Sequence, residues 1–501
     1  MKRIIFILIM AATWSGCTDL EEEPIGILAP ETFFTTTDNL QAAVDGAYGH
    51  IASEQFWGRK FTLSLLLRGD MVTIGDPTTS SRRIEVDEFR MNGDNGMVTS
   101  FWPRSYAIIG STNYAIEGAA SVEGTEEEVN AIVAQARFVR AFTYYHLVRI
   151  FGEVPYIDFA VREAEALSSI EKTSVEEIYE GIIEDLEFAK TWLPDQQPFR
   201  SMPSKGTAAS YLASVYLTIG NWQGAYDEAT FVINNSGRFG YALEADFQDL
   251  FDATKADGLV EHIFSIDFKG LDVISGAPGI DFLPPVTGMR GPDIEGWSVA
   301  VPTVAVFDSF DDNDYRKVVS FDTEAVFDGV TVPWQDFGTA NRGVSRPHIA
   351  KYYRFPGTAG NNNRDSDHNY GAMRYAEVLL IAAEASNELS GPTGEAVDYI
   401  NQIRARARNA AGTMNTFPED LTSGLSKDQL RDAILEERRI ELAFEFKRWY
   451  DIKRLNLGME VFGPTSMEPQ TNFDSTRDYL FPLPDDELGR NPNLLPQNPG
   501  Y

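Results

Sequence analysis

The chain has 501 residues, of which 43% are hydrophobic, 12% aromatic and 23% charged, and these fractions exclude a disordered, collagen-like or multi-span membrane protein. The 75 acidic residues outnumber the 42 lysines and arginines and give a formal net charge of −33, which is unsuited to binding the phosphates of nucleic acid. The one cysteine, Cys17, excludes an intrachain disulfide and a cysteine-based zinc cluster.

The N-terminus has the pattern of a secretion signal. Two cations precede an apolar run from Ile4 to Ala12, which is shorter than the roughly 20 residues of a membrane span but suits a signal-peptide core. The following Ser15-Gly16-Cys17 resembles a bacterial lipobox, and Thr18 to Glu23 resembles the acidic export tag of surface lipoproteins. We therefore expect residues 1–16 to be a lipoprotein signal peptide and Cys17 to carry the lipid. The alternative is an N-terminal strand or a buried helix.

Helical patterns occupy both ends of the remaining chain and leave an irregular part between them. Apolar residues recur close to every 3.6 positions before residue 236 and again after residue 370. Between these parts glycine, proline, aspartate and asparagine are frequent, and Ile263 to Ile266 has a strand-like composition. The tail from Tyr479 to Tyr501 is rich in proline and asparagine. The predicted helices are Glu31–Ala52, Val98–Gly118, Thr125–Phe151, Thr173–Trp192, Ser204–Ile219, Trp222–Asn235, Met373–Leu389, Gly394–Asn409 and Lys427–Leu455.

Some of these helices carry the spacing of a tetratricopeptide repeat. Leu212, Ala213, Tyr216 and Ala225 match the leucine, small residue, tyrosine and alanine of one such unit. Small residues let two antiparallel helices approach each other, while the tyrosine fills the space beside them. The pattern predicts a scaffold of helix pairs and says nothing about chemistry.

Motifs along almost the whole chain resemble the SusD/RagB family of outer-membrane nutrient-binding lipoproteins. They occur in the order that the family has, from the lipobox to the last residue. The segments that carry the resemblance are Phe33-Phe34, Ala42 to Tyr48, Trp102 to Tyr106, Arg137 to Ala141, Phe151 to Tyr156, Pro203 to Ile233, Arg374 to Leu380, Asn401 to Ala407, Glu436 to Glu445, Asp451 to Arg454 and Phe481 to Tyr501.

The resemblance implies a mainly α fold, with a tetratricopeptide-like scaffold of helix pairs and irregular inserts that contain short strands. It implies one SusD-like domain over residues 17–501, with an N-terminal helical part at about 24–235, an irregular insert at about 236–370 and a C-terminal helical part and tail at 371–501. Its implied function is non-catalytic. Such a lipoprotein is anchored in the outer membrane through its N-terminal lipid, captures oligosaccharides and delivers them to a SusC-like TonB-dependent β-barrel.

An acidic helix invites comparison with a glycosidase, which needs two carboxylates roughly 5–10 Å apart, one of them with a raised pKa. The carboxylates of Glu436 to Glu445 share their helix with arginines, and spacings such as Glu436–Arg439 and Glu445–Arg448 favour ion pairs. Neighbouring arginines lower the pKa of a carboxyl, so we interpret these residues as structural. The five histidines show no metal-binding spacing, and no cofactor is expected.

A cluster of aspartates offers carboxylates of the kind that bind calcium. Asp308, Asp311, Asp312 and Asp314 lie close in sequence, but the glycine and terminal glutamate of an EF-hand are missing. The segment Phe307 to Arg316 instead resembles the family's Asp-x-Arg turn. Calcium is therefore only weakly supported, and no metal ligands are assigned.

A sugar site needs aromatic faces for the C–H surfaces of the ring and amide, carboxylate or guanidinium groups for its hydroxyls. By resemblance to the family, we expect these groups in the loop after the first helices and in the central insert. Met91 to Thr99 lacks the aromatic residue that starch-binding members carry there, which argues against starch. The candidate ligand-binding residues are Arg68, Asp70, Arg82, Asn95, Trp297 and Trp334.

Trp297 and Trp334 could each instead pack beneath an insert, since large aromatic residues are commonly buried. The four tryptophans at helix motif positions, Trp102, Trp192, Trp222 and Trp449, are expected in the core. Three functions remain open: a glycan-capture lipoprotein, a peptide-capturing relative of the RagB branch, and a surface glycosidase. The net charge disfavours a highly anionic polysaccharide unless a local basic cluster, around Arg82-Arg83, counters it.

Overall fold

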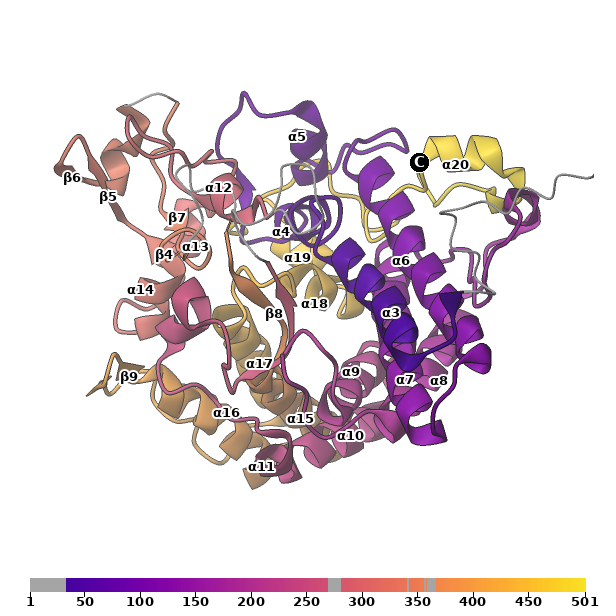
Figure 1. The fold of residues 1–501 in the computed structure, drawn as a ribbon. Coiled ribbons are helices and arrows are strands. Elements are labelled where there is room, and N and C mark those ends of the chain that lie inside the picture. Colours follow the sequence, from indigo (N-terminus) through magenta and orange to yellow (C-terminus); the bar gives the residue numbers. More distant parts are fainter. Residues whose placement is uncertain (1–32, 269–280, 340–341, 356, 358–365) are drawn as a thin grey trace, which may run out of the picture.

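The computed structural model describes residues 33–268, 281–339, 342–355, 357 and 366–501. The signal peptide and Cys17 lie outside these residues. Helices dominate the described part, and its strands are short and pair two by two (Figure 1). The mainly α, tetratricopeptide-like fold predicted from the sequence is confirmed. None of the helices described has both the length and the apolar character needed to cross a bilayer.

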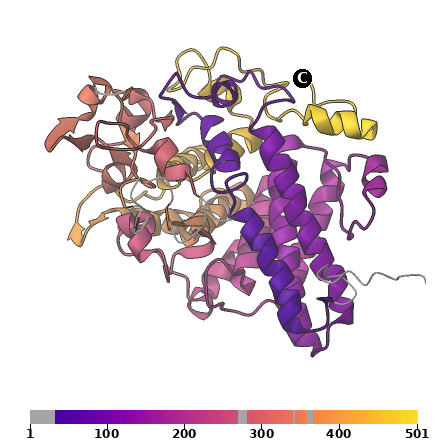
Figure 2. The same cartoon turned by 45° about the horizontal axis from the view of Figure 1, so that its top comes forward.

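Consecutive helices stack side by side to form a curved scaffold. Each long helix of the N-terminal half packs against the next long helix in sequence, and the last of them then packs against α15 of the C-terminal half. Figure 2 shows the long N-terminal helices on the opposite side of the molecule from the irregular insert. The helices of the scaffold are α3 (Thr37–Ile51), α6 (Val98–Gly118), α7 (Glu126–Phe151), α8 (Val175–Trp192), α9 (Lys205–Thr218), α10 (Trp222–Asn234), α15 (Tyr375–Ser390), α16 (Gly394–Ala407) and α17 (Lys427–Glu441).

Side chains of serine and threonine fix where several of these helices begin. Thr125 and Ser204 each form a capping box, in which the hydroxyl accepts a hydrogen bond from the backbone N–H three residues later. The tetratricopeptide spacing is confirmed by the packing of Tyr216 against α10. A Cβ atom added to Gly224 would lie 2.8 Å from the Tyr216 ring, so the two helices approach closely only because residue 224 is glycine.

The C-terminal helices differ from the prediction in two places. Met373 and Arg374 belong to β8 (Asn369–Arg374), which pairs antiparallel with β2 (His262–Asp267), and α15 begins only after them. The predicted helix Lys427–Leu455 is broken into α17 and α18 (Arg448–Arg454). Phe444 has a φ of 66° in the break, which ends the helical path between the two helices.

Among the α-helices before residue 236, α4 (Lys60–Leu67) and α5 (Ser81–Asp87) were not predicted, because the pattern that marks an amphipathic helix is missing from them. In α4 every residue after the first is buried, so no polar face alternates with the apolar one. The second helix, α5, has only seven residues. Both lie near the top of Figure 1, beside the insert.

The insert and the tail consist of short elements. The predicted strand at Ile263 to Ile266 is confirmed as part of β2. The remaining strands and helices are β1 (Thr73–Ile74), α11 (Ser236–Phe239), α12 (Leu283–Thr287), β3 (Ala300–Val301), α13 (Val304–Asp308), α14 (Tyr315–Ser320), β4 (Phe321–Asp322), β5 (Glu324–Phe327), β6 (Val330–Pro333), β7 (His348–Ile349), β9 (Asn409–Ala410), β10 (Thr413–Met414), α19 (Gly458–Val461) and α20 (Asp485–Arg490).

The carboxylates of α17 and of the break after it bind cations of the insert and of α16 inside the protein. Arg316 Nη1 lies 2.6 Å from Glu437 Oε1, and Arg374 Nε lies 2.7 Å from Glu445 Oε2. Burial alone would raise the pKa of Glu441, but Arg406, Arg374 and Arg316 outweigh it and lower the pKa. These residues therefore join the scaffold to the insert.

Of the two ion pairs predicted by spacing, one forms and one does not. Glu436 pairs with Arg439 at 2.7 Å, as predicted. Glu445 instead pairs with Arg374 and Lys351, because the break after α17 turns it into the interior. The predicted Glu445–Arg448 pair is therefore wrong.

Candidate functional site

Four cations and two aromatic rings gather where α4, α5 and the segment around α12 meet. We call Arg59, Lys60, Arg82, Arg83, Phe282 and Trp297 the arginine–tryptophan site. Its residues come from the start of α4, from α5 and from the segments on either side of α12. The backbone joins these parts directly, because Phe282 N–H donates to the Gly58 carbonyl at 2.8 Å and Trp297 N–H to the Pro285 carbonyl at 2.6 Å.

The two aromatic rings of the site form a half-buried pair. The Phe282 and Trp297 ring centroids are 5.9 Å apart, with an angle of 28° between the planes. The Arg59 guanidinium lies 4.8 Å from the Phe282 centroid and 5.8 Å from that of Trp297, and the Arg83 guanidinium also lies 5.8 Å from Trp297. The electron-rich faces of the rings thus hold two arginines in place.

Hydrogen bonds fix the other cations. Lys60 Nζ donates to Ser100 Oγ at 2.7 Å, and Arg83 Nη1 donates to Thr79 Oγ1 at 2.9 Å. The stem of Arg82 lies across Gly96, where an added Cβ would be 3.1 Å from Arg82 Cδ. The loop before α5 and the start of α6 therefore hold cations of α4 and α5 in place.

Burial and mutual repulsion lower the pKa values of Lys60 and Arg83. Burial lowers the pKa of Arg83 to about 10, and the neighbouring Arg59 and Arg82 add to the effect. Burial also lowers the pKa of Lys60, again with repulsion from Arg82. Glu54, which pairs with Arg59, partly offsets the repulsion. The site thus concentrates positive charge in a chain whose net charge is −33.

Asn95, a predicted ligand-binding residue, is buried and forms hydrogen bonds with residues of α5. Its amide nitrogen donates to the Arg82 carbonyl at 3.0 Å and to Glu85 Oε2 at 2.7 Å, and its oxygen accepts from Met97 N–H at 2.9 Å. Its side chain is only 2% exposed. Asn95 therefore positions Arg82 and does not offer its amide to a ligand.

Two other candidates lie in the core, so their assignment to a ligand site is wrong. Arg68 has no exposed surface, and its guanidinium donates to the Asp478 carbonyl at 3.0 Å while lying 4.2 Å from the Phe89 ring centroid. Asp70 is 1% exposed and accepts two hydrogen bonds from Arg448. Both side chains bind the C-terminal part of the chain to α4, and neither reaches a surface.

Trp334 is not brought together with Trp297. It follows β6 and packs against a separate apolar cluster of Met289, Ala325, Phe327 and Phe337. Its ring centroid is 6.5 Å from that of Phe307. Its place is therefore under the β5–β6 hairpin. The four tryptophans expected in the core are buried or packed against it, as predicted: Trp102, Trp192, Trp222 and Trp449.

Three residues of the site, Arg59, Lys60 and Phe282, were not predicted from the sequence, and Arg83 was predicted only as part of a basic cluster with Arg82. One signal could have found the first two. The Arg59-Lys60 pair stands directly before the apolar run that forms α4, and two adjacent cations at the start of a buried helix must face outward from it.

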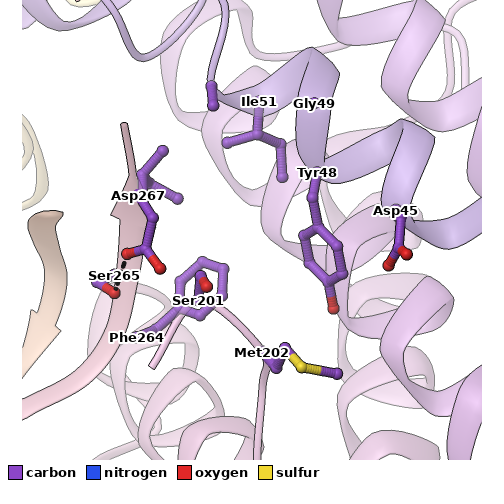
Figure 3. A pocket seen from close by; sticks show the side chains of 11 residues that line it. Asp45, Tyr48, Gly49, Ile51, Ser201, Met202, Phe264, Ser265 and Asp267 are labelled. Atoms are coloured by element: carbon purple, nitrogen blue, oxygen red, sulfur yellow. Dashed lines mark hydrogen bonds between the residues drawn. The ribbon is translucent and has the colours of Figure 1, made fainter. Parts of the chain in front are cut away.

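A separate pocket of about 300 Å³ lies between α3 and β2 (Figure 3). Tyr48 and Ile51 form its α3 side, and Phe264 and Asp267 form its β2 side. Asp267 accepts a hydrogen bond from Ser265 Oγ at 2.7 Å. The charged residues that line this pocket, Asp45 and Asp267, are acidic. The pocket therefore carries negative charge, whereas the arginine–tryptophan site carries positive charge.

Two of the four aspartates that could have suggested calcium, Asp312 and Asp314, pair with cations. Asp314 lies 2.8 Å from Arg316 Nη2, and Asp312 Oδ1 lies 2.6 Å from Lys317 Nζ. In the part of the chain that the structure describes, no group of three or more histidine, cysteine, aspartate or glutamate side chains is arranged to hold a metal ion. In this turn, Asp314 therefore binds Arg316 and Asp312 binds Lys317.

Comparison with known proteins shows what this fold is similar to. A family model described as "Starch-binding associating with outer membrane" matches residues 35–217, and one described as "SusD family" matches residues 338–501. A crystal structure of a SusD homolog from Bacteroides thetaiotaomicron has a TM-score of 0.81 at 23% identity, covering 94% of this chain and 98% of that one. Surface glycan-binding protein A of the same species, in complex with laminarihexaose, has a TM-score of 0.78 at 20% identity, covering 93% and 100%.

A curated relative is closer in sequence. The SusD-like protein P2 of Formosa agariphila is 57% identical over the whole length of both chains. Such identity over the full length extends across scaffold, insert and tail alike. The chain therefore belongs to the SusD family.

Proposed function

We propose that this protein captures glycans at the cell surface, without catalysis, and delivers them to a SusC-like TonB-dependent β-barrel in the outer membrane. Cys17 would carry the lipid anchor. The observation that carries the proposal is the aromatic pair Phe282–Trp297, flanked by the guanidinium groups of Arg59 and Arg83. Apolar ring faces beside fixed hydrogen-bond donors suit the two sides of a sugar ring.

The comparisons support a glycan as the ligand class. The family description for residues 35–217 names starch binding and association with the outer membrane, and one structural neighbour is in complex with laminarihexaose. The SusC-like partner is implied by family membership alone. Co-purification of this protein with a β-barrel from detergent-solubilised outer membranes would test that part of the proposal.

The carboxylates argue for capture without catalysis. Although burial raises the pKa of Glu445, Arg374 and Lys351 outweigh it and lower the pKa, so this group is a poor proton donor. Asp87 does have a raised pKa of about 7, caused by its burial, and Glu468 lies near it. However, Asp87 is 4% and Glu468 is 7% exposed, and neither faces an open surface where a glycan chain could enter.

The purified protein should be titrated by calorimetry with oligosaccharides and with peptides, and each mixture should then be analysed for products. We expect saturable binding of at least one glycan with no new reducing ends. Binding of peptides alone would favour the RagB-like alternative. Release of shorter sugars, lost in an Asp87→Asn variant, would establish a glycosidase and overturn the proposal.

A further inference from the structure

Resting on the proposed function, we infer that the arginine–tryptophan site selects glycans whose sugar units carry an anionic group, either a sulfate ester or a uronate carboxylate. The anion would be bound by Lys60, Arg82 and Arg83, next to the rings of Phe282 and Trp297. The inference starts from a contrast between these cations and the buried arginines elsewhere in the same molecule.

Elsewhere, several deeply buried arginines are neutralised by carboxylates. Arg140 Nε lies 2.7 Å from Asp185 Oδ2, Arg316 Nη1 lies 2.6 Å from Glu437 Oε1, and Arg374 Nε lies 2.7 Å from Glu445 Oε2. Each of these guanidiniums has a side-chain exposure of 6% or less. This is the arrangement that the cost of burying a charge demands.

The arginine–tryptophan site departs from that rule. Over the residues described by the structure, Lys60, Arg82 and Arg83 have no carboxylate within 4 Å, although Arg83 is only 8% exposed. The Nε–H of Arg82 is buried and has no hydrogen-bond acceptor. Of the nearby acids, Glu54 pairs with Arg59, and Glu85 accepts from Asn95. The site therefore holds more cations than its own carboxylates neutralise.

An anion from outside would supply the missing partner. It would relieve the repulsion between Arg59, Arg82 and Arg83 that lowers the pKa of Arg83. The net charge of −33 repels anionic polymers at long range, so a local cluster is needed if such a polymer is to bind. The ring pair beside the cluster would contact the apolar face of the same sugar unit.

A neutral sugar would not make these contacts equally well. Its hydroxyls could accept hydrogen bonds from the guanidiniums, but they would cover the cations without neutralising them. The chemistry of the site therefore favours an acidic over a neutral sugar unit of similar shape. A sulfate ester and a carboxylate both supply this chemistry.

The experiment compares each acidic oligosaccharide with its own neutral derivative. The full mature protein is titrated with native and carboxyl-reduced alginate and pectin oligosaccharides, with native and desulfated carrageenan oligosaccharides, and with laminarihexaose. We expect an acidic oligosaccharide to bind and its neutral derivative to bind at least about 10-fold more weakly, as for a lost charged hydrogen bond. Which pair responds tells a sulfate from a carboxylate.

Variants then place the effect at the site. Arg82→Gln should weaken binding of the acidic oligosaccharide at least about 10-fold, whereas Arg82→Lys should keep most of the affinity. Arg162→Gln removes one positive charge from a side chain that is 65% exposed outside the site and should leave the affinity unchanged. Thermal unfolding of each variant checks that it is folded.

The outcomes separate this inference from the proposed function. If neutral glycans bind as well as their acidic counterparts, or if Arg82→Gln and Arg162→Gln have equal effects, the inference is overturned while glycan capture stands. If no glycan of any charge binds, the proposed function fails and the inference fails with it.

Discussion

Asp70 and Arg448, 378 residues apart in the sequence, form a bidentate ion pair with both N–O distances at 2.7 Å. The pair joins the residues after α4 to the first residue of α18, and Asp70 is 1% exposed. Replacing Asp70 with asparagine leaves Arg448 without a counter-charge in a buried setting. We expect the free energy of unfolding to fall by about 3 kcal/mol, measured by urea denaturation. Glycan affinity at temperatures where the variant is folded should not change, and a selective loss of affinity would return Asp70 to the binding site.

The two tryptophans of the insert should respond differently to removal. Trp297→Ala should weaken glycan binding about 10-fold, because it removes one ring of the pair and the surface that holds Arg59 and Arg83. Trp334→Ala should instead lower stability by about 2 kcal/mol through lost packing with Phe337 and its neighbours. Calorimetric titration and thermal unfolding of both variants measure the two effects. An unchanged dissociation constant for Trp297→Ala would remove it from the site.

Asp87 gives stability a defined dependence on pH. Burial raises its pKa from 3.8 to about 7, so the folded protein holds a proton there that the unfolded chain has lost. The stability that this proton supplies is complete below pH 4 and is lost as the pH rises towards 7. Asp87→Asn should therefore stabilise the protein at pH 8, by at most about 4 kcal/mol, and change little at pH 4. Denaturation curves at both pH values test this, and a pH-independent difference would contradict it.

Two glutamates of α17 form a matched comparison between a buried and an exposed ion pair. Glu441 is fully buried between Arg374 and Arg406, and Glu441→Gln should cost about 3–5 kcal/mol of stability. Glu436 is 50% exposed and pairs with Arg439 at 2.7 Å, so Glu436→Gln should cost less than about 1 kcal/mol. Thermal unfolding of the two variants side by side measures the difference. Equal losses would show that burial does not decide the strength of these pairs.

Local patterns in the sequence were sufficient to predict the scaffold. Hydroxyl residues at helix starts, such as Ser174 and Ser204, and apolar residues at helical spacing depend only on neighbours a few positions away. The break after Glu441 could not be predicted in this way. The break carries Glu445 to Arg374 and Lys351, which precede it by 71 and 94 residues, and contacts over such separations leave no local pattern.

The same reasoning explains which of the predicted site residues lie together in the structure and which lie in the core. Arg82 and Trp297 stand in polar, glycine-rich surroundings that mark a surface, and they do meet at the arginine–tryptophan site. Arg68 and Asp70 have the same residue types but find partners at Asp478 and Arg448, about 400 positions later. A polar residue near a predicted site does not reveal whether a distant part of the chain will cover it.

The internal use of arginine has a consequence for the outside of the molecule. Arg316, Arg374 and Arg406 are enclosed together with the carboxylates that they neutralise, so these cations contribute little to the field around the protein. The excess of acidic residues is then displayed mainly towards solvent. Two copies of the protein must repel each other at low ionic strength, which keeps them dispersed at high local density, and added salt must reduce that repulsion within a Debye length of about 10 Å at 0.1 M.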